Sequence, residues 1–329
     1  MFNGYPNAFG ENIALMAQKA EFKKRVTVAG VCMLAVFGIS RAWAYAYFYL
    51  TGMFGISVQA AREFVSSPMA GEILQIIIST FAMTVPFLIG LSFLRLRTDD
   101  VIPFGAPEKN VTVPLLLFGM GCCTFANYAV SRAGQIFESF GFSYSVTPSE
   151  EPTGFFGTAV VIIASAVFPA LVEEFAFRGV IMGILMPFGE GFSIVATAAL
   201  FGILHGNFEQ IPFAFLVGLI LCFIRAKTGS IWPGIILHFL NNLYATVMGM
   251  LYDTLPVFEV SLIFGVFRLL VIVLGIIGLY KYITVRKTEP YLKGDTVIPE
   301  RKKYLWFATS PAVIAFTLFA VVLSLRFFN

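Results

Sequence analysis

Hydrophobic residues in this chain form long, nearly unbroken runs rather than short alternating patterns. A helix that crosses a membrane needs about 20 mostly apolar residues, and most of the runs approach or exceed that length. The pattern therefore predicts a bundle of transmembrane helices. Nine segments stand out, at residues 27–50, 72–94, 112–132, 154–185, 191–206, 210–225, 231–251, 259–283 and 305–327.

Two of these segments depart from a simple span. The run at 154–185 contains Pro169 and is long enough to be tilted or broken there, because proline interrupts helical hydrogen bonding. The run at 191–206 is short for a span. With one or two runs at the membrane surface, the expected fold is an all-α polytopic transmembrane bundle of eight or nine spans.

Composition strengthens this prediction. Of the 329 residues, 58% are hydrophobic and 12% are charged, whereas a soluble domain has roughly 45–50% apolar and 25% charged residues. The chain has too little polar surface to face water on all sides, so the lipid bilayer is its expected surroundings. No basic run is dense enough to indicate a nucleic-acid partner.

The positions of lysine and arginine predict the orientation, because short cytoplasmic loops carry an excess of these residues. Basic residues cluster before the first segment and after the second, sixth and eighth, while acidic residues occupy the intervening loops. We expect a cell-membrane protein with a retained cytoplasmic N-terminus. The expected regions are a cytoplasmic segment at 1–26, accessory helices at 27–132, a core at 154–251, and C-terminal helices with a basic cytoplasmic loop at 259–329.

Three ionisable residues interrupt the fourth segment in the sequence LVEEFAFRGV. Charges at membrane depth cost about 2.5–3.5 kcal/mol each on insertion scales, so they need partners or a function. Glu174 and Arg178 are four residues apart and share a helix face, where they can pair. Glu173 points about 100° away from Glu174. It is therefore the candidate general base.

Both histidines of the chain lie close in sequence to this acidic helix. His205 ends the fifth segment in LFGILHGN, and His238 lies in the seventh segment in GIILHFLNN. Phe201 and His205 share one helix face, as do His238 and Asn242. Three segments thus offer a carboxylate, two imidazoles and an amide, and we expect these groups to meet in one intramembrane cavity.

The three patterns, EEFAFR, FGILH and HFLNN, resemble the Glu-Glu-x-x-x-Arg, Phe-x-x-x-His and His-x-x-x-Asn motifs of one family. It is the CAAX prenyl protease and bacteriocin-processing family, also called the Abi family. The resemblance covers residues 154–251 and implies an intramembrane endopeptidase of glutamate type. It further implies that Glu173 and His205 polarise the attacking water, and that Glu174 and Arg178 hold the acidic helix in place.

The same resemblance implies that His238 and Asn242 donate hydrogen bonds to the oxyanion. The implied substrate is a membrane-anchored, prenylated or amphipathic peptide, and no cofactor is expected. Zinc is the alternative, because two histidines and a glutamate form a known hydrolytic ligand set, which Glu173, His205 and His238 supply. The HExxH form of that site is absent.

Two non-enzymatic functions remain open from the sequence. In a membrane scaffold or bacteriocin-immunity protein, the polar residues would only specify helix packing. In a proton-coupled transporter, Glu173 would relay protons, as acidic groups in membrane helices often do. The absence of a visible internal repeat counts against the transporter, since many transporters consist of repeated halves.

Two further arginines, Arg41 and Arg268, lie within apolar segments. Each is expected to pair with a buried carboxylate or to extend its long side chain toward the membrane surface. The functional alternative is a clamp for the carboxylate of a substrate.

Overall fold

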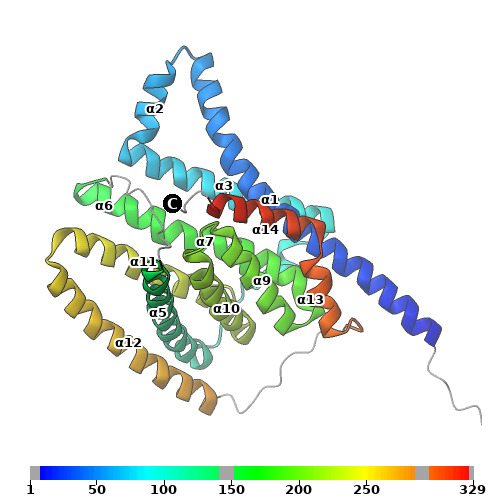
Figure 1. Ribbon diagram of the computed structural model, residues 1–329. Coiled ribbons are helices and arrows are strands. Elements are labelled where there is room, and N and C mark those ends of the chain that lie inside the picture. The colour runs from blue at the N-terminus through cyan, green and yellow to red at the C-terminus, as the bar shows by residue number, and fades with distance from the viewer. Residues whose placement is uncertain (1–7, 141–151, 286–295, 326–329) are drawn as a thin grey trace, which may run out of the picture.

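The computed structural model describes residues 8–140, 152–285 and 296–325. Within these ranges the regular elements are all helices, arranged as a bundle from which the two ends of α1 project (Figure 1). Seven helical segments are long and apolar enough to cross a membrane, and an eighth is added if the bent pair α13–α14 forms one span. The predicted all-α polytopic bundle is confirmed, and the chain is a multi-pass membrane protein.

The observed helices follow the predicted runs closely. In chain order they are α1 (Ala8–Met53), α2 (Val58–Ser66), α3 (Pro68–Leu94), α4 (Thr98–Val101), α5 (Lys109–Ser139), α6 (Gly154–Ile162), η1 (Ile163–Val167), α7 (Phe168–Glu174), η2 (Phe175–Ile181), α8 (Met182–Leu185), η3 (Met186–Phe188), α9 (Glu190–Leu204), α10 (Gln210–Thr228), α11 (Trp232–Thr254), α12 (Val257–Val285), α13 (Glu300–Ala308) and α14 (Pro311–Ser324).

The count of spans differs at α9. This helix has 15 residues, which extend over about 22 Å, less than the roughly 30 Å of a bilayer core. In the described part of the chain the structure therefore supports seven or eight spans and gives no support for a ninth.

The predicted last span is broken. Helices α13 and α14 meet at an angle of 55°, and Pro311 occupies the first turn of α14. Proline is favoured in the first turn of a helix, because backbone N–H groups there have no intrahelical acceptor and proline, which has no N–H, loses no hydrogen bond. The predicted basic loop before α13 includes residues 286–295, which lie outside the described residues.

The first helix begins far before the predicted apolar run. Ala8 starts α1, and a salt bridge of 2.7 Å between Glu21 and Arg25 lies on its polar part. Hydropathy predicts where a chain enters a membrane and not where helical structure begins. The hydropathy pattern also missed the short amphipathic helix α2. The Ser57 hydroxyl caps the first turn of this helix by accepting a hydrogen bond from the Ala60 N–H.

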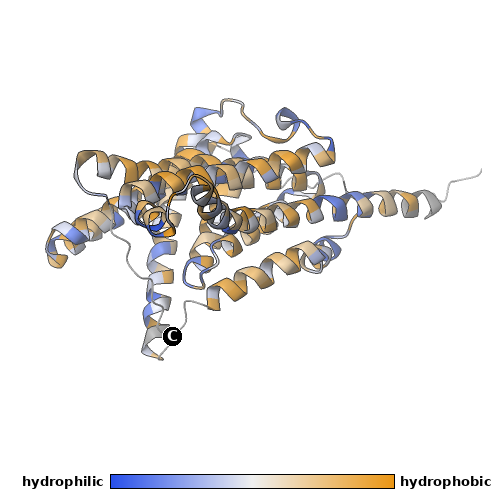
Figure 2. Ribbon diagram, turned by 90° about the horizontal axis from the view of Figure 1, so that it is seen from above, coloured by the Kyte–Doolittle hydropathy of each residue, from blue (hydrophilic) through white to orange (hydrophobic). Residues whose placement is uncertain are grey.

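The main hydrophobic core brings the accessory helices onto the acidic helix. Phe22 of α1 and Phe87 of α3 are fully buried in the same cluster as Phe177 and Phe201. On the other side, α11 packs against α7 and η1, and α10 packs against α9. Hydrophobic residues predominate along the helices, with hydrophilic stretches between them (Figure 2). The polar candidates of the site therefore lie in an apolar frame.

Candidate active site

The helical segment Gly154–Phe188, which carries Glu173 and Glu174 and is called the acidic helix, contains two π-helical turns. One lies on each side of α7. The first, η1, precedes Phe168, and the second, η2, follows Glu174 directly. A π turn inserts an extra residue into a helical turn and is frequent at functional sites. The segment is not broken at Pro169: Gly154–Phe188 is one continuous apolar helical segment, and the first π turn ends two residues before this proline.

Pro169 also explains a contact across the site. Proline has no N–H, so the carbonyl of Ser165, four residues earlier, lacks its usual α-helical donor. The side-chain amide of Asn242 on α11 donates to this carbonyl at 3.3 Å. The proline therefore creates an acceptor that ties α11 to the acidic helix.

Glu174 and Arg178 form the pair that their spacing predicts. The Nη1 atom of Arg178 donates to Oε1 of Glu174 at 2.7 Å, and both side chains are completely buried. Arg178 also donates to the Gly218 carbonyl at 3.4 Å, and its guanidinium carbon lies 4.3 Å from the centre of the Phe201 ring. This ion pair is shielded from solvent on all sides, so loss of either partner would leave a buried, uncompensated charge.

His238 lies between the two glutamates. Its Nδ1 atom is 2.9 Å from Oε1 of Glu174. The carboxylate accepts, so Nδ1 is the donor. Its Nε2 atom is 3.8 Å from Oε2 of Glu173, beyond the range of about 2.7–3.2 Å for a direct hydrogen bond. The two groups are therefore neighbours without a direct hydrogen bond.

The two glutamates differ in their access to solvent. The Glu173 side chain is 19% exposed, whereas the Glu174 side chain is 0% exposed. Glu174 is bound by Arg178 and His238. Among the described contacts, the one polar neighbour of Glu173 is His238, at the longer distance of 3.8 Å. Glu173 is thus the carboxylate that a water or substrate can approach.

A glycine permits the close approach of α11 to Glu174. A Cβ atom on Gly234, one turn before His238, would lie 2.7 Å from Oε2 of Glu174. Real Cβ atoms essentially never come so close to an oxygen, so any other residue here would push the carboxylate or the helix aside. The sequence prediction missed Gly234, because its role depends on the distance between two helices.

His205 occupies the C-terminal cap of α9 and forms a local hydrogen bond. Its Nδ1 atom is 2.9 Å from the Phe201 carbonyl, which fixes Nδ1 as the donor and leaves Nε2 as an acceptor in the neutral ring. The Phe201 ring lies edge-on to both imidazoles, with centroids 5.1 Å from His205 and 5.9 Å from His238. Among the described contacts none joins His205 to Glu173.

The polar stripe of α11 is longer than predicted. Thr246, one turn beyond Asn242, has its hydroxyl 2.9 Å from that of Ser165 and 3.0 Å from the Asn242 carbonyl. Ser165 also donates to the Val161 carbonyl at 2.6 Å, a local backbone bond typical of helical serines. The spacing of 238, 242 and 246 is the sequence signal that extends the stripe.

A metal site does not fit this geometry. In the described ranges, no three or more histidine, cysteine, aspartate or glutamate side chains come close enough together to hold a metal ion. The ligand set Glu173, His205 and His238 is therefore not assembled in the described part of the chain.

One family model matches the segment of the chain that contains this cluster. Residues 155–244 match the family model described as "Type II CAAX prenyl endopeptidase Rce1-like". This range contains all six predicted site residues, so the resemblance read from the three motifs is confirmed over that segment. The helices on either side of it lie outside the match.

One curated relative is similar over a segment of this size. It is named "Putative membrane peptidase YdiL", from Bacillus subtilis (strain 168), and is 28% identical over 90 residues. The alignment covers 27% of this chain and only 37% of the length of that relative. No solved structure matches the chain.

Proposed function

We propose that this protein is an intramembrane peptidase that hydrolyses a peptide bond of a membrane-associated substrate. The observation that carries the proposal is the placement of Glu173, partly exposed and 3.8 Å from an imidazole that the buried Glu174–Arg178 pair holds. The similarity of residues 155–244 to prenyl endopeptidases supports the same reaction class.

In this proposal Glu173 is the general base. A water hydrogen-bonded to its carboxylate gives up a proton as the water oxygen attacks the scissile carbonyl carbon, and the C=O π electrons move onto the oxygen. When the tetrahedral intermediate collapses, the C–N bond breaks and the proton passes from Glu173 to the departing amine. Water is thereby added across the peptide bond.

The remaining groups orient the reactants. Asn242 uses one amide N–H for the Ser165 carbonyl, and an amide carries two, so the other is available to the oxyanion. His238 already donates through Nδ1 to Glu174. Its Nε2 can donate to the oxyanion only when the ring carries both protons. His205 is proposed to hold the water or leaving group through Nε2.

The substrate is proposed to be a membrane-anchored or amphipathic peptide, with a prenylated peptide as one candidate. A site among apolar helices selects for a chain segment that already resides in or at the bilayer.

The test is cleavage by the purified full-length protein in liposomes, with a panel of fluorogenic peptides that carry or lack a prenyl group. We expect Glu173→Ala and His205→Ala to abolish cleavage while the helical content and unfolding midpoint stay near those of the wild type. A general base typically contributes about 10²–10⁴-fold, so Glu173→Gln should lower kcat/KM by that factor. Cleavage at the normal rate by either alanine variant contradicts the proposal.

A scaffold or immunity function is the second candidate, and one observation favours it. The Glu174–Arg178–His238 network is buried and joins helices in the manner of a packing element. Under that function Glu173→Gln would lower stability without loss of any catalytic activity. The same purified variants therefore distinguish the two functions.

A further inference from the structure

Two arginines outside the candidate active site converge on one tyrosine within the membrane-spanning helices. The guanidinium carbon of Arg268 on α12 lies 5.4 Å from the centre of the Tyr128 ring on α5, and that of Arg132 lies 5.2 Å from the same ring. Arg268 follows the start of α12 at Val257 by 11 residues, or about 17 Å along the helix.

Neither arginine has a carboxylate partner among the residues that the structure describes. Arg132 donates to the Gln135 side chain at 2.9 Å. Glu209 lies beside Gly134 at the same end of α5, but no ion pair joins it to either arginine in the described ranges. The buried partner carboxylate expected for Arg268 is thus not found there. Two like charges near one ring repel each other, and an anion between them would offset that repulsion.

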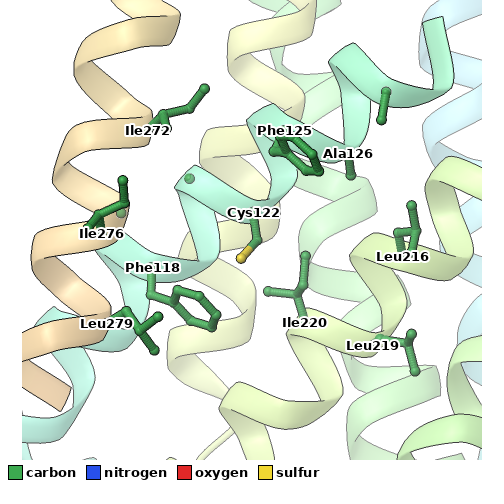
Figure 3. Close-up of a pocket in the computed structure, with 13 residues that line it drawn as sticks. Phe118, Cys122, Phe125, Ala126, Leu216, Leu219, Ile220, Ile272, Ile276 and Leu279 are labelled. Atoms are coloured by element: carbon green, nitrogen blue, oxygen red, sulfur yellow. The ribbon is translucent and has the colours of Figure 1, made fainter. Parts of the chain in front are cut away.

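An apolar groove of about 420 Å³ runs along the same helices (Figure 3). Its floor is α5, and its two walls are α12 and α10. It opens toward the outside of the bundle, since Phe125 and Ile276 on its rim are 62% and 64% exposed. Its lining residues are Phe118, Gly121, Cys122, Phe125, Ala126, Ala129, Leu216, Leu219, Ile220, Ile272, Gly275, Ile276 and Leu279.

The helix register places the arginines at one end of this groove. A Cβ on Gly121 would lie 2.9 Å from Gly275, and one on Gly278 would lie 2.5 Å from the Pro114 carbonyl, so α5 and α12 run antiparallel. The last lining residue of α5, Ala129, and the first lining residue of α12, Ile272, therefore lie at the same end of the groove. Arg132 and Arg268 lie three and four residues beyond these positions, one helical turn away.

The groove has the length of one acyl chain in a leaflet. Its floor extends from Phe118 to Ala129, about 17 Å at 1.5 Å per residue. Half of a bilayer core is about 15 Å thick. An apolar channel of that length, with cations at one end, matches a molecule that has a hydrocarbon tail and an anionic head.

We propose that this groove is a binding site for an anionic membrane phospholipid. One acyl chain lies along α5 between α10 and α12, and the phosphate is held by Arg132 and Arg268 at the Tyr128 end. Arginine suits this task because its planar fork matches phosphate oxygens. None of the lining residues belongs to the six predicted site residues, so the inference does not depend on the peptidase proposal.

The experiment is a lipid titration of the full-length protein in dodecyl maltoside, followed by thermal unfolding and native mass spectrometry. A ligand that binds the folded state raises its stability in proportion to the logarithm of ligand concentration over Kd. Phosphatidylglycerol is expected to raise the unfolding midpoint and to appear as a retained adduct. Phosphatidylcholine with the same chains is expected to do so much less.

Variants locate the site. A basic residue near anionic lipid contributes about 1 kcal/mol, so Arg268→Gln and Arg132→Gln should each weaken phosphatidylglycerol binding about fivefold. Ala129→Phe, which keeps the charges and fills the groove, should also weaken it. The matched control is Arg62→Gln, which removes an exposed arginine on α2 and should leave the affinity unchanged.

Several results overturn the proposal. Equal weakening by Arg62→Gln would mean that only net charge matters. Equal stabilisation by inorganic phosphate would show an anion site without a chain site, and equal binding of phosphatidylcholine would show an unselective apolar surface. A lipid-free dimer that loses its contact in Ala129→Phe would assign the groove to a second copy of the chain. Because Ala129 and Arg132 are both exposed, their variants remain informative if Arg268→Gln folds poorly.

Discussion

Two helix contacts in this molecule are equally close but differ in chemistry. Where α11 meets α7, Gly234 lies against a carboxylate that also binds an arginine and a histidine. Where α12 meets α5, Gly121 and Gly275 bring two backbones together, and Arg268 contacts the Tyr128 ring further along the same pair of helices. The hydrophobic effect does not drive helices together within lipid, so both contacts depend on close packing. Only the contact between α11 and α7 adds buried hydrogen bonds and an ion pair.

The difference separates a region built for chemistry from a region built for packing. The polar contact lies within residues 155–244, the range similar to prenyl endopeptidases. The glycine contact between α5 and α12 lies outside that range, and much of α12 is exposed on the surface of the bundle. Variants at the first contact should therefore alter both stability and cleavage, and variants at the second should alter stability alone.

The largest effect on stability is expected from Arg178→Ala. It leaves Glu174 as a buried charge without its ion partner, and breaking a buried pair costs about 3–5 kcal/mol. The double variant Glu174→Gln, Arg178→Met should recover part of that loss, because it removes both charges. Unfolding free energy in detergent is the measurement, and Arg62→Ala is the exposed control, expected within about 0.5 kcal/mol of the wild type. A loss from Arg178→Ala no larger than this control would contradict the account of the buried pair.

A smaller loss is expected from Gly234→Ala. The added methyl would lie 2.7 Å from Oε2 of Glu174, and overpacking of this kind costs about 1–3 kcal/mol. It should also displace His238 and lower kcat/KM in the cleavage assay. Gly249→Ala on the same helix, where nothing lies within 4 Å, is the control. Alanine favours helix over glycine by about 1 kcal/mol, so that variant should be neutral or more stable, and equal behaviour of the two would refute the close-approach role.

A similar loss is expected from Gly275→Ala, but with a different functional result. Its Cβ would meet Gly121 at 2.9 Å, and the backbone there can yield only if the helices separate, at a cost of about 1–3 kcal/mol. Because α12 carries none of the predicted site residues, kcat/KM should not change. Gly265→Ala, in open space on α12, is the matched control. A fall in kcat/KM for Gly275→Ala, without a fall for Gly265→Ala, would contradict the separation of a catalytic region from a packing region.

The smallest effect is expected from Thr246→Val, which removes the hydroxyl bonded to Ser165 and keeps the shape. Interhelical hydrogen bonds in membranes average about 0.6 kcal/mol, so the unfolding free energy should fall by about that amount. Ser165→Ala removes the other half of the same bond and should cause a similar loss. If the double variant loses the sum of the two, the hydroxyls do not interact.

The sequence predicts the bundle and part of the site well. Spans follow from hydropathy, and the Glu174–Arg178 pair follows from a four-residue spacing that local helix geometry fixes. The bend between α13 and α14 was not predicted, because hydropathy alone treats residues 305–327 as one run, although Pro311 at the start of α14 is a local sign of it. Each of these features depends on residues that are close in the chain.

Features that depend on contacts between distant helices were not predictable from one sequence. Gly234 is one glycine among 29, and only the position of Glu174 gives it a role. The Ser165 carbonyl became an acceptor through Pro169, but its partner Asn242 is 77 residues away. The role of His205 remains a prediction, because its described hydrogen bond is to Phe201 in its own helix and cap.

The central claim is that two adjacent glutamates have separate tasks: Glu173 acts on water and Glu174 holds the helices together. The most direct test compares Glu173→Gln with Glu174→Gln, measuring the unfolding free energy and kcat/KM of each on the same preparation. The account predicts that Glu173→Gln retains wild-type stability and loses about 10²–10⁴-fold in kcat/KM, whereas Glu174→Gln is clearly destabilised. Equal destabilisation by both variants, with cleavage retained by Glu173→Gln, would contradict it.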